Sequence, residues 1–221
     1  MVKVKRSMPA PESLKIESRK HSGSYKERDV IDRLERDFNG KCYICGIKPI
    51  SDPQVEHLRP HKGGRYPDRK FDWNNLFLVC PHCNNVKNQE KYDDNVIDCC
   101  SKDPEDMIVF TYEKEGVHAV AINQNDYEAV NTSALIEEVF NKKNTGIRVY
   151  ASKVRMDGLA KEMKTLFLLL RDYKKSGDAN DEHLIRMLSA TLSRKSAYAA
   201  FKRCYVRQHS DEYAGLQRLL A

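Results

Sequence analysis

The sequence predicts an α+β protein in which a small, loop-rich module is followed by a β-hairpin and a mainly helical C-terminal region. Two Cys-x-x-Cys pairs frame two short strand-like runs, residues 107–123 alternate apolar and polar side chains, and later segments repeat apolar residues at helical spacing. We therefore expect three parts: a basic extended arm (residues 1–24), the loop-rich module (25–100), and the hairpin with the helical region (101–221).

The composition of the 221 residues is that of a folded, soluble domain, with 40% hydrophobic and 32% charged side chains. The longest apolar run, Leu166–Leu170, is too short to span a membrane. The basic start of the chain is not followed by the apolar stretch of a signal peptide. We therefore expect a cytoplasmic protein with no membrane partner.

The net charge of +6 is unevenly distributed along the chain. Residues 1–28 carry 8 basic and 3 acidic side chains, and residues 134–221 carry 17 and 10. Between these basic regions, residues 101–133 carry 2 basic and 7 acidic side chains. Basic terminal regions suit a polyanionic partner such as nucleic acid, although solvated helix faces would give the same pattern.

The expected elements follow from apolar spacing and from turn residues. Ile31, Leu34 and Phe38 share one face of a helix that ends at Asn39–Gly40. Alternation on both sides of Glu115–Gly116 predicts a hairpin over 107–123. Three later helices are expected, followed by a short one at the end of the chain: one that opens with Ser133 as N-cap, one over 148–174, and one over 181–208.

Four of the seven cysteines form two Cys-x-x-Cys pairs, Cys42/Cys45 and Cys80/Cys83. Each pair brings two thiolates to one metal from a tight turn, and two pairs complete a closed tetrahedral site for structural Zn²⁺. Two redox pairs or free thiols are the alternatives. We interpret the other three cysteines, Cys99, Cys100 and Cys204, as ordinary thiols, with redox activity of one of them as the alternative.

A closed four-cysteine site cannot do chemistry itself, yet Glu56 and His57 stand between its two halves. A neutral imidazole takes a proton from water near neutral pH, which suits His57 as a general base. A hard cation such as Mg²⁺ prefers oxygen ligands, which Glu56 and the amide of Asn84 supply. Because neighbouring strand residues point to opposite faces, the strand has to end or distort at His57 for both side chains to serve one site.

This arrangement resembles the HNH endonucleases of the ββα-metal type, in their zinc-stapled branch. The residues that carry the resemblance are Glu56–His57, Asn75–Leu76, Asn84 and Lys87, framed by the cysteine pairs over about residues 41–91. The resemblance implies phosphodiester hydrolysis with His57 as general base, Glu56 and Asn84 on Mg²⁺, and Asn75 pinning the intervening loop. Two positions depart from the commoner motif: Asn84 replaces a final histidine and Glu56 replaces an aspartate.

Basic side chains follow the motif histidine and also occur on the helix after it. We expect phosphate contacts from five residues, with solvated surface as the alternative for those in the loop: Arg59, His61, Lys62, Arg65 and Lys87.

A looser resemblance extends beyond the module. The segments "VKRSMPAPESL" (residues 4–14) and "DPED…IEEVFNKKNTGIR" (103–106 and 136–148) are similar to HNH nuclease subunits of bacterial antiphage systems of the Septu type. That resemblance implies an ABC-type ATPase as partner and nucleic acid as target, with DNA favoured over RNA. A stand-alone restriction or mobile-element nuclease, or a non-catalytic zinc module that binds nucleic acid or protein, remain alternatives.

Overall fold

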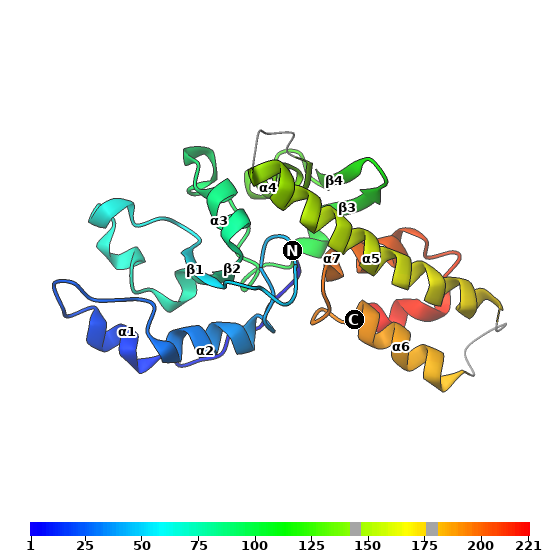
Figure 1. Ribbon diagram of the computed structural model, residues 1–221, viewed down its shortest axis with the longest axis horizontal. Coiled ribbons are helices and arrows are strands. Elements are labelled where there is room, and N and C mark those ends of the chain that lie inside the picture. The colour runs from blue at the N-terminus through cyan, green and yellow to red at the C-terminus, as the bar shows by residue number, and fades with distance from the viewer. Residues whose placement is uncertain (142–146, 176–180) are drawn as a thin grey trace.

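The computed structural model describes residues 1–141, 147–175 and 181–221, and it describes the side chains of all these residues except 147 and 148. Helices and two small antiparallel sheets alternate, which confirms the α+β class (Figure 1). No described helix is long and apolar enough to span a membrane. The main elements are α1 (Glu12–Glu17), α2 (Arg28–Asp37), β1 (Gln54–His57), β2 (Leu76–Val79), α3 (Pro81–Lys87), β3 (Ile108–Glu113), β4 (Gly116–Ala121), α4 (Tyr127–Asn141), α5 (Ile147–Lys175), α6 (Glu182–Leu192) and α7 (Ala199–Gln208).

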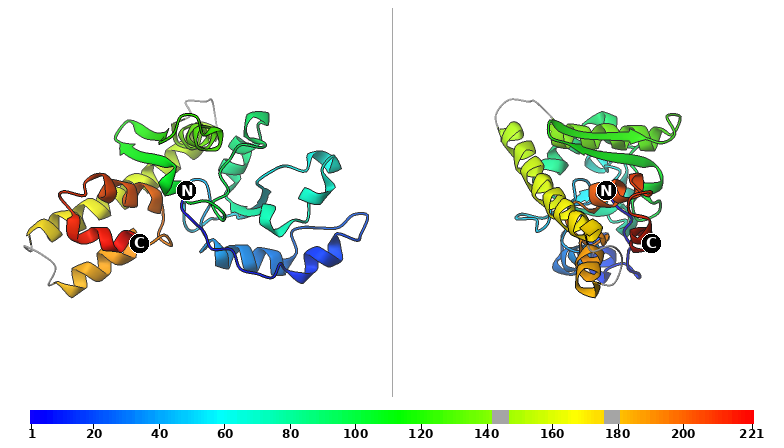
Figure 2. Two further views of the ribbon diagram at one scale, coloured as in Figure 1. Left: turned by 180° about the vertical axis from the view of Figure 1, so that it is seen from behind. Right: turned by 90° about the vertical axis from the view of Figure 1, so that its right-hand side faces the viewer.

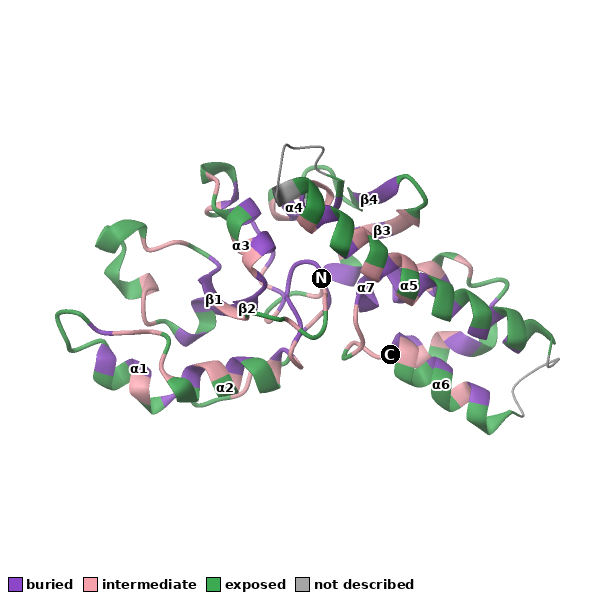
Figure 3. Ribbon diagram, viewed as in Figure 1, coloured by how far each residue is buried: buried purple, intermediate pink, exposed green. Residues whose placement is uncertain are grey.

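Strands β1 and β2 pair in antiparallel register, and α3 follows β2 directly, so the expected ββα unit is present. Glu56 lies opposite Phe77 and His57 lies opposite Leu76. All four residues of β2 are buried, which explains why its sequence is a continuous apolar run rather than an alternating one (Figure 3).

The N-terminal arm packs against the rest of the protein. Met1, Val2 and Val4 are buried, and the backbone N–H of Val4 donates to Cys99 O at 2.9 Å. Figure 2 shows this first stretch running beside α2, and α1 interrupts the arm. The Arg6 guanidinium lies 4.8 Å from a ring centroid of Trp73. The arm alternates small apolar residues with basic ones, and the apolar residues form part of the hydrophobic core.

The predicted hairpin is confirmed as β3 and β4, and α4 packs against β4. Helix α4 begins six residues before the predicted N-cap Ser133, which is buried within the helix. The carboxylate of Asp126 accepts hydrogen bonds from the N–H groups of Glu128 and Ala129 at 3.0 and 3.1 Å. Asp126 therefore caps the helix, and the serine signal was misleading because both residue types favour that position.

The long helix predicted over 148–174 is confirmed as α5, but the helix predicted over 181–208 is two helices. Residues 193–198 separate α6 from α7, and Tyr198 has a positive φ of 49°. This segment contacts the first cysteine turn, where Tyr198 N–H donates to Gly46 O at 2.9 Å and Lys41 Nζ donates to Ser196 O at 3.2 Å. The segment between the two helices contains no glycine or proline, so the sequence gives no local signal for the break. The break coincides instead with these long-range contacts.

Candidate functional site

The four paired cysteines meet in one buried cluster between the start of α3 and the turn that follows α2. Their Sγ atoms all lie within 4.8 Å of one another, and Cys45 Sγ is 3.9 Å from Cys80 Sγ. A tetrahedral Zn²⁺ with Zn–S bonds of about 2.3 Å would place neighbouring sulfurs about 3.8 Å apart. None of the cysteines is in a disulfide. The donor set and its spacing therefore fit one metal ion.

An arginine that the motif does not include completes the surroundings of this cluster. Arg155 lies on α5, is buried, and donates from Nη2 to Cys80 Sγ at 2.9 Å. The pKa of Cys80 is held below its ordinary value by hydrogen bonds from Cys42 and the other two thiols, together with the Arg155 charge. A thiolate is the metal-binding form of cysteine. No local sequence signal identifies Arg155, which lies 75 positions from Cys80.

A cleft of about 210 Å³ lies beside the cluster and brings the predicted catalytic residues together. Glu56, His57 and Asn84 all line it. Glu56 and His57 are neighbours in β1, which ends at His57, and both line the cleft. Tyr25 and Lys26, which precede α2, form another wall of the cleft, and the motif gives no reason to expect them there.

Glu56 presents a single unengaged oxygen. Its Oε1 accepts from Lys87 Nζ at 2.7 Å, whereas its buried Oε2 has no hydrogen-bond partner among the described residues. Lys87 Nζ also donates to the backbone oxygens of His57 and Leu58, at 3.3 and 2.8 Å. Burial raises the pKa of Glu56, and the Lys87 ammonium and the nearby Tyr43 hydroxyl oppose that rise. A carboxylate oxygen that no donor occupies is a suitable ligand for a hard cation.

Asn84 is held by a residue of β1. Its Nδ2 donates to Gln54 Oε1 at 2.8 Å, which fixes the amide nitrogen on Gln54 and leaves the amide oxygen available. Gln54 and Glu56 are two residues apart on the strand and therefore share a face. The sequence places Gln54 at the start of the strand, but nothing in it indicates contact with Asn84.

His57 is buried and its ring is fixed on three sides. The Nε2 atom lies 3.0 Å from Lys70 O, and because a carbonyl oxygen only accepts, Nε2 carries the hydrogen and Nδ1 is the basic nitrogen. The ring centroids of Tyr25 and His61 lie 4.4 and 4.9 Å from that of His57. Burial lowers the pKa of His57 from 6.5 to about 4, so the imidazole is neutral at neutral pH.

Asn75 is buried and pins the loop between the two strands. Its Oδ1 accepts from Arg59 N–H at 2.8 Å, and its Nδ2 donates to the backbone oxygens of Arg59 and Arg69, both at 2.9 Å. The second of these carbonyls is next in the chain to Lys70, whose oxygen holds His57. Asn75 thus supports the loop that supports the histidine.

The five residues expected to contact phosphates are divided among different places. His61 and Lys62 line the cleft, and Lys62 forms an ion pair with Asp93. Arg59 lines a different cavity, beside Arg69 and Lys102. Arg65 is exposed against the ring of Tyr66 and lies outside the cleft lining. Lys87 also lines the cleft, but it is buried with three acceptors around its ammonium, and its contact with a phosphate stays a prediction.

Comparisons with known proteins agree with this geometry over a limited part of the chain. A 74-residue stretch is 36% identical to the Septu protein PtuB of Bacillus mycoides (strain KBAB4), covering 28% of this chain and 25% of that relative. The chain thus matches a quarter of the relative's length. No solved structure matches the chain. The family model described as HNH endonuclease matches residues 42–90, which contain both cysteine pairs, Glu56, His57, Asn75 and Asn84. Residues 42–90 are therefore an HNH endonuclease domain.

Proposed function

We propose that this protein is a metal-dependent endonuclease that hydrolyses phosphodiester bonds in nucleic acid, with DNA favoured over RNA. The observation that carries the proposal is that one cleft is lined by three side chains: the carboxylate of Glu56, the amide of Asn84 and the neutral ring of His57. The HNH family match over residues 42–90 supports the same reaction class.

In the proposed reaction His57 is the general base. Its Nδ1 takes a proton from a water molecule as the water oxygen bonds to phosphorus and the P–O bond to the leaving oxygen breaks. The leaving oxygen then takes a proton from solvent. The Lys70 carbonyl keeps Nε2 protonated, so the ring presents the correct nitrogen throughout.

Glu56 and Asn84 would hold a hard divalent cation, most simply Mg²⁺. When bound there, such an ion neutralises charge on the phosphoryl and leaving oxygens. Lys87 keeps one oxygen of Glu56 occupied and Gln54 keeps the nitrogen of Asn84 occupied, so each side chain has one oxygen left for the ion. The partners thereby orient the ligands before the ion arrives.

The four cysteines would hold Zn²⁺ in a structural role. Four sulfurs close the tetrahedral coordination sphere, so no position is left for substrate or water. Cys80 begins α3 and Cys83 directly precedes Asn84, so zinc binding fixes the helix that carries one catalytic ligand. Binding free energy at such a site contributes to folding free energy.

We further propose that the protein acts in antiphage defence together with an ABC-type ATPase, in the cytoplasm. The similarity to a Septu protein supports the defence role. Co-purification of the protein with the product of a neighbouring ATPase gene would test the partnership. A fully active enzyme that binds no ATPase would instead favour a stand-alone nuclease.

The decisive experiment compares the wild type with His57→Ala on plasmid DNA and total RNA, with and without Mg²⁺. We expect Mg²⁺-dependent cleavage by the wild type and a loss of at least a hundredfold in the variant, because general-base catalysis contributes about 10²–10⁴ in rate. His118→Ala, at an exposed histidine of β4, is the matched control. Zinc content measured on each sample verifies the fold. A zinc-loaded wild type that cleaves nothing would favour a non-catalytic binding module.

A further inference from the structure

A second concave surface lies between the N-terminal arm, the C-terminal end of α2 and the loop before α7. This cavity of about 350 Å³ is termed the basic groove. Of the side chains that line it, Asp37 alone is acidic. Six are basic: Lys3, Lys5, Arg36, Lys41, Arg194 and Lys195. Concave surfaces lined by one sign of charge concentrate the electrostatic potential.

The positive charge of the basic groove is only partly neutralised from within, by the ion pair between Arg36 and Asp37 at 3.3 Å. Within the described residues, Lys3, Lys5 and Lys195 make no ion pair. Asp37 is already engaged, because its Oδ2 accepts from the N–H and the hydroxyl of Ser7, at 2.9 and 2.7 Å. Three ammonium groups that face a cavity without carboxylate partners remain available to an anionic ligand.

A buried ammonium adds to the charge of the groove wall. Lys41 is 4% exposed, and its Nζ donates to the backbone oxygens of Arg194 and Ser196 rather than to a carboxylate. Solvent and salt screen a buried charge much less than an exposed one. Through its two hydrogen bonds, Lys41 also fixes the loop that forms the opposite wall.

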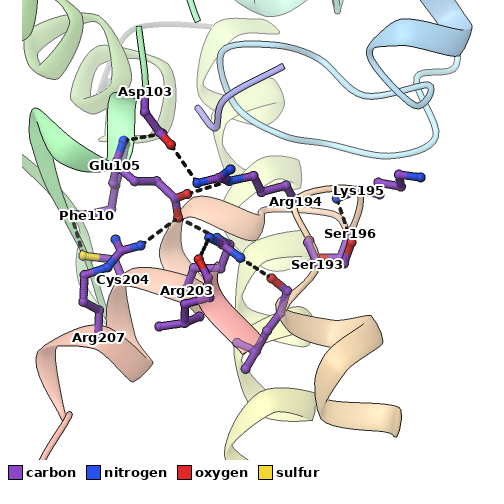
Figure 4. A network of polar contacts seen from close by, with 12 residues as sticks. Asp103, Glu105, Phe110, Ser193, Arg194, Lys195, Ser196, Arg203, Cys204 and Arg207 are labelled. Carbon is purple, nitrogen blue, oxygen red and sulfur yellow. Dashed lines mark hydrogen bonds and ion pairs between the residues drawn. The ribbon is translucent and has the colours of Figure 1, made fainter. Parts of the chain in front are cut away.

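That loop is held rigidly from its other side. Arg194 donates to Asp103 at 2.7 Å and to Glu105 at 3.1 Å, and Glu105 also pairs with buried Arg203 at 2.7 Å. Figure 4 shows Arg194 pointing into this network while Lys195 points away from it. Because Arg194 anchors the backbone, Lys195 is presented at the groove without the entropic cost of ordering a free loop.

The basic groove and the catalytic cleft lie near opposite ends of α2. Lys26, just before the helix, lines the cleft, and Arg36, in its last turn, lines the groove. At 1.5 Å per residue these positions are about 15 Å apart along the helix. Phosphates follow one another at about 3.4 Å of axial rise along a nucleic acid strand. A span of about four or five nucleotides therefore joins the two sites.

We propose that the basic groove binds the sugar–phosphate backbone of the nucleic acid substrate about five nucleotides from the bond that the cleft hydrolyses. This inference rests on the proposed function of the cleft. Lysine contacts to phosphates add affinity without sequence preference, and they release counterions on binding. The groove thus lengthens the footprint of a small nuclease domain and favours long substrates over short ones.

The test uses a variant with Lys3→Gln, Lys5→Gln and Lys195→Gln. Its matched control is Lys114→Gln, Lys161→Gln and Lys164→Gln, which removes the same charge from exposed positions that do not line the groove. Binding of fluorescent 30-nucleotide duplexes of DNA and of RNA is measured by anisotropy across salt concentrations without Mg²⁺. Three lost phosphate contacts lower the slope of log affinity against log salt by about 2–3 for the groove variant.

Cleavage assays with Mg²⁺ separate the groove from the cleft. We expect the ratio of kcat/KM for a 20-nucleotide substrate to that for a 4-nucleotide substrate to fall at least tenfold in the groove variant and to stay unchanged in the control. Equal weakening of both variants, or a groove variant that binds like the wild type, would overturn the groove while leaving the cleft intact. A wild type that binds no nucleic acid at all would overturn both proposals.

Discussion

Lys87 Nζ lies 2.7 Å from Glu56 Oε1, and both side chains are buried at the base of the cleft. The lysine that resembles a phosphate contact in the sequence is therefore a partner of the carboxylate proposed to bind the cation. Its ammonium also joins the end of β1 to α3 through the backbone oxygens of His57 and Leu58. The pair serves the site by fixing the orientation of Glu56.

Replacing Lys87 with methionine should leave a buried, unpaired carboxylate. We expect the free energy of unfolding at pH 7 to fall by about 3–5 kcal/mol, measured by chemical denaturation. The double variant Lys87→Met, Glu56→Gln should regain part of that loss, because no charge is then stranded. A single variant as stable as the wild type would show that Glu56 does not depend on the lysine.

Replacing Gln54 with alanine should free the amide of Asn84 to rotate. We expect affinity for Mn²⁺ in the cleft to fall about 10–100-fold, measured by electron paramagnetic resonance of the ion. Gln54→Glu is the control, since it keeps an oxygen that accepts from Asn84 Nδ2 and should retain most of the affinity. Equal Mn²⁺ affinity in the wild type and Gln54→Ala would contradict the positioning role.

The pKa of His57 predicts a pH effect on stability. The folded protein holds this imidazole neutral down to about pH 4, whereas the unfolded chain protonates it near 6.5. Unfolding therefore takes up a proton between these values, so stability is lost as the pH falls from about 6.5 to about 4. At about 1.4 kcal/mol per pH unit the loss is about 3 kcal/mol.

His57→Gln should lack this component, which a pH series of denaturation curves measures as the difference between the two proteins. Zinc release at low pH affects both proteins and cancels in the comparison. NMR titration of the wild-type imidazole gives an independent reading, and a pKa close to 6.5 would contradict the burial argument.

Arg155 should slow the loss of zinc. In Arg155→Met, Cys80 loses a charged donor, and we expect a chelator to extract the metal about 10–100-fold faster. Arg171→Met, on the exposed face of the same helix, is the matched control. A colorimetric zinc indicator follows the release. Equal rates in the wild type and Arg155→Met would show that the four sulfurs hold the ion without this contact.

Much of the local architecture could be predicted because its signals are local. Cysteine spacing, alternation in the hairpin and the helical stripe of α2 are each contained within a few residues. The order of the motif residues likewise places Glu56, His57 and Asn84 in one domain. These three residues line one cleft, as the motif predicts. Their catalytic roles stay predictions.

The parts that could not be predicted depend on contacts between distant segments. Arg155 reaches Cys80 from another helix, and the break before α7 arises from contact with the turn at Gly46. Gln54 gives no signal because an amide at a strand start is ordinary. The buried contact of Lys87 with Glu56 could not be predicted either, because nothing in the sequence distinguishes a buried lysine beside a nuclease motif from an exposed one.

The contact between the cysteine turn and the residue that precedes α7 limits how this protein can be reduced in size. Gly46 has φ +78°, and a Cβ there would lie 3.1 Å from the backbone of Tyr198, so a side chain at that position would strain the turn and crowd the neighbouring segment. A fragment trimmed to residues 42–90 would lose both the contact of Gly46 with Tyr198 and the hydrogen bond from Arg155 to Cys80. A unit meant for transfer to another protein therefore extends through α7, well beyond the matched residues 42–90.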